Sequence, residues 1–385
     1  MEYFLNEQQK TVKGLARMIA EQRILPVRAE LDEKEEFPWD LIREMANSDL
    51  LRIFIPEKYE GLGGGCLDLC LVIEELSRVC GGIAISYGAN ALGALPLISY
   101  GTEEQKGKYL PDVASGKRLT AFALTESTAG SDAANIRTVA TREKGGYLIN
   151  GTKQFITNGG EAEIYTIIAM TDPARGSRGA SALIVEKNTP GFSFGKKEKK
   201  MGIRSSATRE LIFHDCRVPE ENIIGREGQG FIIAIRTLDR SRPGVGAQAV
   251  GIAQGALEAA VDYARQRIQF GHPISSIQAV QHMLADMATE LEAARALVYA
   301  VARTIDAGAK SFTEEAAMVK VFATDMAMKV TTDAVQILGG AGYMRDYPVE
   351  KMMRDAKITQ IYEGANQVVR NTIALELLKR KARQE

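Results

Sequence analysis

The spacing of apolar residues changes twice along this chain, and that change limits the possible folds more than any single motif does. Residues 1–118 and 226–385 repeat apolar side chains at the three- and four-residue intervals typical of helices. Residues 119–225 instead contain short β-type runs bounded by Gly, Pro, Asp and Ser. No crossover helix separates those runs, which favours an antiparallel barrel or sandwich over a parallel sheet. We therefore predict an α+β, mainly α fold with an N-terminal helical domain, a middle antiparallel β-barrel or sandwich, and a C-terminal helical bundle.

Local signals refine this prediction. Asn6, with Gln9 three residues later, predicts a capping box at the start of the first helix. The Asn150-Gly151 pair after a strand-like run predicts a hairpin turn. Small residues over 88–94 predict a helix that a neighbouring helix or another bulky group can approach closely. The high content of small residues in the last long helices indicates a tightly packed bundle.

The composition excludes several classes of protein. The chain of 385 residues has a net charge of −1 and a pI of about 6.4. It therefore has no basic field for nucleic acid or a membrane surface, although local patches could still bind phosphates. Its four cysteines lack Cys-x-x-Cys spacing and it has only three histidines, so we expect no zinc site. The few cysteines, a polar N-terminus and the lack of a run of about 18 apolar residues predict the bacterial cytoplasm or the mitochondrial matrix as its location.

Two segments of the β-region carry side chains suited to a planar, polar ligand. Residues 121–132 run from a strand into a turn rich in hydroxyls and glycine, which can offer backbone N–H groups to a ring edge or a phosphate. Phe155 and Thr157 lie two residues apart on a strand, so both face one side, where they could stack on and hydrogen-bond to a heterocycle. A structural turn and an ordinary core pair are the alternatives.

Three further segments lie in the C-terminal helical region. Residues 239–243 and 265–271 place arginines near helix ends. Such arginines are usually solvated, but they also suit bidentate binding of a pyrophosphate. Residues 336–342 form a glycine-rich turn that either caps a helix or contacts a phosphate. The chain has neither a Gly-x-Gly-x-x-Gly after a strand nor a Walker-type loop, so a bound nucleotide would not use a Rossmann unit.

One carboxylate near the C-terminal end, that of Glu363, is the candidate for chemistry. Tyr362 and Gly364 flank it. An aromatic ring on one side and a glycine on the other can hold a carboxylate in an apolar pocket with the backbone close beside it. That environment suits a general base for a weakly acidic C–H group. A helix N-cap or a solvated loop glutamate is the ordinary alternative.

Taken in this order and across nearly all of the chain, these segments resemble the acyl-CoA dehydrogenase family. The match is carried by 122–132, 155–159, 267–271, 336–340 and 362–367. The resemblance implies an N-terminal helical domain, a middle β-domain and a C-terminal four-helix bundle, assembled as a homotetramer with one FAD per subunit. It also implies an oxidoreductase of fatty acid or carboxylic acid degradation. Such an enzyme converts an acyl-CoA to a trans-2-enoyl-CoA and passes the electrons to electron-transfer flavoprotein.

The resemblance further implies roles for individual residues. Glu363 corresponds to the base that removes the pro-R α-proton of the acyl thioester. The implied contacts to FAD are Phe122, Leu124, Thr125, Ser131, Phe155, Thr157, Arg267, Phe270, Gln278, Gln336, Gly340 and Gln367. The implied contacts to the substrate are Ser131, Asp239, Arg242, Tyr362 and Gly364, and no metal is implied. The group made up of Arg267, Phe270, Gln278, Gln336 and Gly340 would reach across a subunit interface.

Some positions depart from the family pattern. Ala365 stands where threonine is common, so one hydroxyl contact to FAD is absent. Phe155 stands where many relatives have tryptophan, and Ser127-Thr128 replaces a more usual Pro-Gly in a turn, which we expect to matter little.

Several readings of the function stay open at this point. An oxidase that passes electrons to O₂, a reductase that forms saturated acyl-CoA, and a helical scaffold without chemistry are the alternatives. We expect a short- or medium-chain acyl-CoA substrate, with a pocket floor formed near 88–94, by Tyr362 and by the start of the C-terminal domain. A branched or cyclic acyl group is also compatible with the small residues there.

Overall fold

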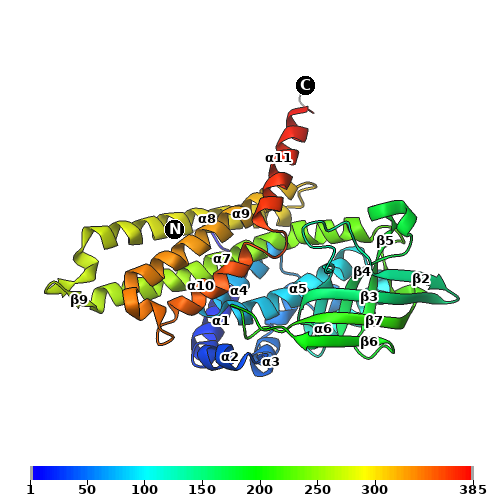
Figure 1. The fold of residues 1–385 in the computed structure, drawn as a ribbon, viewed down its shortest axis with the longest axis horizontal. Coiled ribbons are helices and arrows are strands. Elements are labelled where there is room, and N and C mark those ends of the chain that lie inside the picture. Colours follow the sequence, from blue (N-terminus) through cyan, green and yellow to red (C-terminus); the bar gives the residue numbers. More distant parts are fainter. Residues whose placement is uncertain (1–2, 383–385) are drawn as a thin grey trace.

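The computed structural model describes residues 3–382 and has the predicted order of helical, β and helical regions (Figure 1). The N-terminal helices are α1 (Glu7–Ile19), α2 (Arg28–Lys34), α3 (Trp39–Asn47), α4 (Cys66–Val79), α5 (Gly81–Tyr100) and α6 (Glu103–Ala114). Helix α1 begins with the predicted capping box. Asn6 Oδ1 accepts from the backbone N–H of Gln9 at 2.8 Å, and Gln9 Oε1 accepts from the N–H of Asn6 at 3.1 Å.

The middle region forms one eight-stranded sheet within residues 3–382. Its strands are β1 (Thr120–Ala123), β2 (Val139–Glu143), β3 (Gly146–Thr157), β4 (Ile164–Met170), β5 (Ala180–Glu186), β6 (Phe192–Lys197), β7 (Thr208–Pro219) and β8 (Ile223–Ile224). The strand order is β6-β7-β3-β2-β4-β5-β8, and β1 pairs with β4. Most pairs are antiparallel, as expected, but β1 and β2 each pair parallel to β4, so the sheet is mixed. Strand β1, which follows α6, therefore lies beside the buried strand β4. The turn after β1 lies next to the helical region.

The predicted hairpin turn at Asn150-Gly151 is wrong. Strand β3 runs through this pair, and its register against β7 shifts between Ile149 and Gly151, as in a bulge. Gly151 has a φ of 144°, a conformation open to glycine. The turn between β2 and β3 lies earlier, after Glu143, which pairs with Gly146. Pairing with β7 on both sides of the bulge keeps the strand extended, and this non-local pairing outweighs the local preference of the dipeptide.

The C-terminal helices are α7 (Gly230–Gln266), α8 (Gln278–Asp306), α9 (Thr313–Leu338), α10 (Val349–Thr359) and α11 (Asn366–Ala382). Helix α7 packs against α4, α8, α9 and α10. The short hairpin of β9 (Ile268–Gln269) and β10 (His272–Pro273) lies at the end of the bundle far from the sheet, and α11 extends out of the body (Figure 1). The boundaries 118/119 and 225/226 stay a proposal, since each falls in a connection between regular elements.

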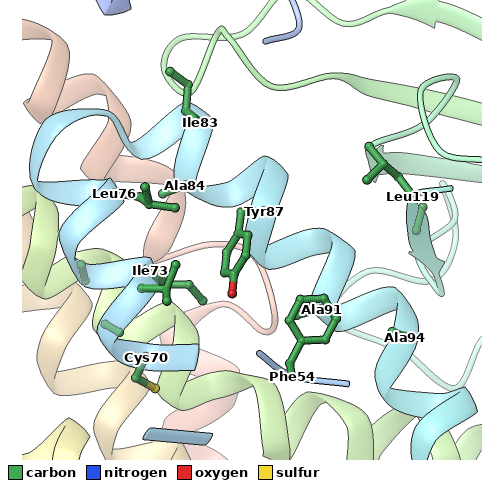
Figure 2. Packing of buried hydrophobic residues seen from close by; sticks show 14 of the residues in the cluster. Phe54, Cys70, Ile73, Leu76, Ile83, Ala84, Tyr87, Ala91, Ala94 and Leu119 are labelled. Carbon is green, nitrogen blue, oxygen red and sulfur yellow. The ribbon is translucent and has the colours of Figure 1, made fainter. Parts of the chain in front are cut away.

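Helix α5 is the central helix of the core and brings all three regions together. It is long and apolar enough to cross a membrane by length and composition, with a mean hydropathy of 1.3 over 18 residues, but 83% of that stretch is buried inside the fold. Figure 2 shows Tyr87 of α5 pointing toward Ile73 of α4 and Phe54. On another face, a Cβ added to Gly93 would lie 2.7 Å from the backbone nitrogen of Ala121 in β1. The small residues of α5 therefore allow a strand to pack directly on its backbone.

Candidate active site

Glu363 lies in the connection between α10 and α11, where the backbone turns sharply. Glu363 and Gly364 have φ values of 53° and 103°, in the left-handed region that glycine favours. Glu363 is half-buried and lines two cavities, a large one of about 480 Å³ and a small one of about 20 Å³. Its carboxylate therefore stands where the two cavities approach each other.

The large cavity lies between the sheet and the C-terminal helices. The residues with implied ligand roles that line it are Phe122, Leu124, Thr125, Ser131, Phe155, Thr157, Asp239, Arg242, Tyr362, Glu363 and Gly364. Phe231 and Leu238 of α7, Thr313 of α9 and Thr372 of α11 also line it, although no sequence motif pointed to them. The cavity combines aromatic rings, hydroxyls and one buried guanidinium, as a site for a large, partly polar ligand requires.

The small cavity is mainly apolar, and its polar lining residues are Ser241, Gln248 and Glu363. Its walls come from α4, α5 and α7 and consist of Leu69, Ile73, Ala84, Ile85, Gly88, Ala91, Leu92, Leu95, Gly244 and Val245, together with Ser241 and Gln248. The predicted floor near 88–94 therefore does contribute, whereas Tyr362 lines only the large cavity. A ligand with a polar body and a short apolar end could fill both cavities and place its middle beside the carboxylate.

Polar neighbours hold the Glu363 carboxylate and set its protonation. The hydroxyl of Ser241 on α7 donates a hydrogen bond to Glu363 Oε2. Burial raises the pKa of Glu363, and Ser241, Arg242 and Lys320 each oppose part of that shift. A carboxylate with a raised pKa is a stronger base once ionised. The sequence did not single out Ser241 within the segment 239–243, because its partner Glu363 lies 122 residues away.

Arg242 is the buried cation of the large cavity. Its Nη1 pairs with Asp239 Oδ1 at 2.6 Å, and the hydroxyl of Thr313 donates to Asp239 Oδ2 at 2.7 Å. Burial raises the pKa of Asp239, while Thr313 and Arg242 oppose the shift. Arg242 is 7% exposed, and its Nε has no hydrogen-bond partner within the described residues. Buried donors are normally satisfied, so an unpaired guanidinium N–H beside the cavity fits a site that a ligand completes.

A buried ion pair fixes the turn after β1. Lys153 Nζ donates to Glu126 Oε1 at 2.7 Å and to the carbonyl of Leu124 at 2.9 Å. The backbone N–H of Gln154 donates to the carbonyl of Thr125 at 2.8 Å. Burial lowers the pKa of Lys153 to about 8, with Glu126 opposing that shift. The turn that carries Leu124 and Thr125 is thus held rigidly against β3, which suits a preorganised binding site.

Phe155 and Thr157 line the large cavity together, but not by regular strand alternation. Phe155 has a φ of 59°, and the register of β3 against β7 shifts between Lys153 and Ile156. This irregularity turns the Phe155 ring outward, where it is 58% exposed, while Ile156 is buried. The expected common face therefore arises from a bulge that the sequence pattern did not reveal.

The remaining implied FAD contacts lie outside the large cavity of a single chain. They are Arg267, Phe270, Gln278, Gln336, Gly340 and Gln367, and all are exposed. Phe270, 88% exposed, lies in the turn between β9 and β10, at the end of the bundle opposite the sheet (Figure 1). The five residues implied to reach across a subunit interface would bind the FAD of a second copy of the chain. A role for all six residues in binding FAD stays a prediction.

The family models that match the chain cover nearly all of it. The acyl-CoA dehydrogenase N-terminal domain matches residues 6–117, the middle domain 121–216 and the C-terminal domain 228–378. The chain belongs to the acyl-CoA dehydrogenase family. Among curated members, it is 49% identical to the acyl-CoA dehydrogenase of Bacillus subtilis over 97% of this chain and 99% of that protein. It is 48% identical to the acryloyl-CoA reductase (NADH) of Anaerotignum propionicum over 99% and 97% of the two chains.

Solved acyl-CoA dehydrogenase structures agree with this membership. The butyryl-CoA dehydrogenase of Megasphaera elsdenii has a TM-score of 0.96 and 47% identity, covering 98% of this chain and all of that one. A chain in a structural study of the electron transferring flavoprotein of Acidaminococcus fermentans has a TM-score of 0.96 and 51% identity at the same coverage. Members of the acyl-CoA dehydrogenase family are FAD-dependent oxidoreductases, and this chain is one of them.

The residues of the large cavity fit the FAD that the family uses. Phe122 and Phe155 present aromatic faces, and Thr125, Ser131 and Thr157 present hydroxyls along the same cavity. Rings of this kind stack on a planar heterocycle, and hydroxyls with backbone N–H groups bind its polar edge. The chain's own residues can therefore hold the flavin end of FAD.

Proposed function

We propose that the enzyme catalyses α,β-dehydrogenation of an acyl-CoA thioester to a trans-2-enoyl-CoA, with Glu363 as the base that removes the α-proton. The observation that carries this proposal is the position of Glu363, which lines both the large, partly polar cavity and the small apolar one. When bound, FAD supplies the acceptor for the hydride that leaves the β-carbon.

The protein residues divide the work between proton removal and stabilisation of charge. A positioned base contributes about 10²–10⁴-fold to the rate. An α C–H is a poor acid, so the negative charge that develops on the thioester oxygen must also be stabilised. We assign this role in part to the backbone N–H of Glu363, since one such donor is worth about 2.7–4 kcal/mol. Gly364, which carries no Cβ, lets the thioester approach the chain closely.

The two cavities support a division of the substrate. The CoA portion would occupy the large cavity, where the guanidinium of Arg242 and the hydroxyl of Ser131 would meet its polar groups. The acyl end would enter the small cavity, whose volume of about 20 Å³ has room for little more than one water molecule. We therefore propose a short-chain acyl-CoA as the substrate, and butyryl-CoA, for which the Megasphaera elsdenii relative is named, is the first compound to test.

The experiment replaces Glu363 by Gln in the FAD-loaded enzyme and follows flavin absorbance after anaerobic mixing with butyryl-CoA. We expect the wild type to bleach, and E363Q to stay yellow, folded and loaded with FAD while bleaching at least about 10²-fold more slowly. A panel of acyl-CoAs of increasing length, scored in the same way, tests the substrate class. Bleaching of E363Q at the wild-type rate would remove Glu363 from the mechanism.

Electron-transfer flavoprotein is the proposed electron acceptor. The likeness to a chain in a structural study of the electron transferring flavoprotein of Acidaminococcus fermentans supports this choice. The likeness to an acryloyl-CoA reductase favours one alternative, in which the physiological direction is reduction of an enoyl-CoA. Release of one peroxide per turnover under air would indicate an oxidase instead. We also propose a homotetramer, for which light scattering should give about four times the chain mass of 42.0 kDa.

A further inference from the structure

The segment that carries Glu363 needs support from outside itself. Glu363 and Gly364 both have positive φ values, 53° and 103°. A residue other than glycine in this region is strained, and it persists only where the surrounding structure holds it. The direction of the catalytic carboxylate is therefore set by whatever fixes the backbone between α10 and α11.

Helix α9 supplies that support through a buried lysine. Lys320 is 0% exposed, and its Nζ donates to the carbonyl of Gly364 at 2.6 Å and to Asn366 Oδ1 at 2.7 Å. Asn366 Nδ2 in turn donates to Thr324 Oγ1 at 2.9 Å and to Asp325 Oδ1 at 2.7 Å. The residues directly after Glu363 are thus tied to α9 by side chains one turn apart.

The same helix also holds the start of the segment. Asp325 accepts hydrogen bonds from Gln360 Nε2 at 2.6 Å and from Arg370 Nη2 at 2.5 Å. Gln360 precedes Glu363 and Arg370 follows it on α11. The backbone that presents the carboxylate is therefore fixed to α9 on both sides. Of these contacts, the hydrogen bond from Lys320 reaches closest to Glu363, because its acceptor is the carbonyl of the next residue, Gly364.

Lys320 also carries a charge that no carboxylate neutralises by direct pairing within the described residues. The charged groups that act on it are Glu363, Arg242, Asp325 and Arg370. Burial lowers the pKa of Lys320 to about 8, while Glu363 opposes that shift, so the amine is still cationic at neutral pH. The same cation, together with Arg242, opposes the rise that burial causes in the pKa of Glu363. Lys320 lines neither cavity and so does not touch the substrate.

We propose that Lys320 is a positioning residue for the dehydrogenation: it fixes the segment that carries Glu363 and favours the ionised form of that carboxylate. This inference rests on the proposed role of Glu363 as the base. Lys320 acts only through Gly364, Asn366 and its charge.

The test uses Lys320→Met in the FAD-loaded enzyme, because methionine keeps the length of the side chain and removes its charge and donors. The matched control is Lys329→Met, which changes an exposed lysine of the same helix that pairs with Glu290. We expect the rate constant of flavin reduction at saturating butyryl-CoA to fall about 10²-fold in K320M, as small displacements of a catalytic group do. The half-saturating concentration should change little, and the acid limb of the rate–pH profile should move to higher pH. K329M should match the wild type in each respect.

Two results would overturn the inference. A purely structural role predicts that K320M loses FAD or thermal stability while each bound flavin is reduced at the wild-type rate with an unchanged acid limb. If K320M does not fold, Asn366→Ala serves instead, since it keeps the cation and removes one of its acceptors. It should slow flavin reduction on the order of tenfold, and a wild-type rate in N366A would equally reject the proposal.

The fate of this inference can be separated from that of the proposed function. If E363Q bleaches normally, the role of Glu363 fails and the inference about Lys320 fails with it. If E363Q is inactive while K320M reduces flavin normally with an unshifted profile, only the inference fails.

Discussion

Two buried lysines lie behind the site, one under each wall, and they differ in what they pair with. Lys153 supports the turn after β1, and Lys320 supports the segment that carries Glu363, the proposed base. Both are 0% exposed, and burial lowers the pKa of each to about 8. Both donate to a main-chain carbonyl, of Leu124 in one case and Gly364 in the other. Lys153, however, also pairs with Glu126, whereas Lys320 has two neutral acceptors.

Because of that difference, Lys153 should only hold the backbone in place, whereas Lys320 should also affect the protonation of Glu363. A buried cation paired with a carboxylate has little net field beyond the pair, so it acts mainly by holding the backbone in place. A cation bonded only to neutral acceptors holds the backbone and also acts on the nearest ionisable group. We infer that the β-side of the site is a rigid binding surface, while the helical side adjusts the basicity of Glu363. Loss of Lys153 should therefore lower mainly the free energy of unfolding, and loss of Lys320 should lower mainly the rate of flavin reduction.

The largest effect expected from this comparison is on folding. Lys153→Met leaves the charge of Glu126 buried without its partner, which costs about 3–5 kcal/mol in the free energy of unfolding. Denaturant titration followed by circular dichroism measures this loss. Flavin that remains bound should still be reduced at nearly the wild-type rate, in contrast to K320M.

A double variant checks the cause of that loss. In K153M/E126Q the buried charge is absent, and the Gln oxygen can still accept from the backbone N–H groups of Arg137 and Thr138, which Glu126 binds now. Most of the stability should return. If the double variant is as unstable as the single one, the ion pair is not what holds this turn.

The next largest effect concerns Gly364, the glycine beside the proposed base Glu363. Gly364→Ala places a Cβ 2.9 Å from Val369 Cγ2 at a φ of 103°. The segment must shift, and we expect flavin reduction to slow about 10²-fold while FAD stays bound. Gly308→Ala is the matched control, because Gly308 also has a positive φ of 80° but nothing lies within 4 Å of an added Cβ. If both variants reduce flavin normally, the position of the base does not depend on this glycine.

The order of helical and β regions could be predicted from sequence because periodicity is a local property. The exceptions are places where a distant partner decides. Strand β3 continues through Asn150-Gly151 and bulges at Phe155 because β7 pairs with it on both sides. No spacing within β3 records that partner, so the hairpin was predicted where a bulge exists.

The site shows the same division. Residues of the flavin-side turn and the carboxylate at 363 stand out by type and neighbours, and the fold brings them to one cavity. The supporting lysines do not stand out, because lysine is ordinarily exposed. The partner of Lys153 is 27 residues away, and the acceptors of Lys320 are 44 and 46 residues away. Only the packed structure shows that these side chains are inside.

The wall of the small apolar cavity is supported by neither lysine, and it should control the length of the acyl chain. Ile73 of α4 lines the small cavity and faces Gly88 of α5, whose added Cβ would lie 3.5 Å from Ile73 Cδ1. Ile73→Ala should lengthen the cavity and raise the ratio of kcat/KM for hexanoyl-CoA over butyryl-CoA about tenfold. Ile19→Ala is the control, since Ile19 is also buried, in α1, but does not line the cavity, and its ratio should not change. An unchanged ratio in I73A would mean that the acyl chain lies elsewhere.

The smallest expected effect is a change in the pKa of Glu363, and it tests whether the helical side of the site adjusts that pKa. The Ser241 hydroxyl donates to the Glu363 carboxylate and so opposes the rise that burial causes in its pKa. Ser241→Ala removes that donor, so the pKa of Glu363 should rise further. Because the base must be ionised, the rate of flavin reduction increases as pH rises through this pKa, and the acid limb should move to higher pH in S241A. Ser241→Thr keeps the hydroxyl and should leave the limb in place, whereas a limb that moves to lower pH in S241A would show that this hydrogen bond does not favour the ionised form.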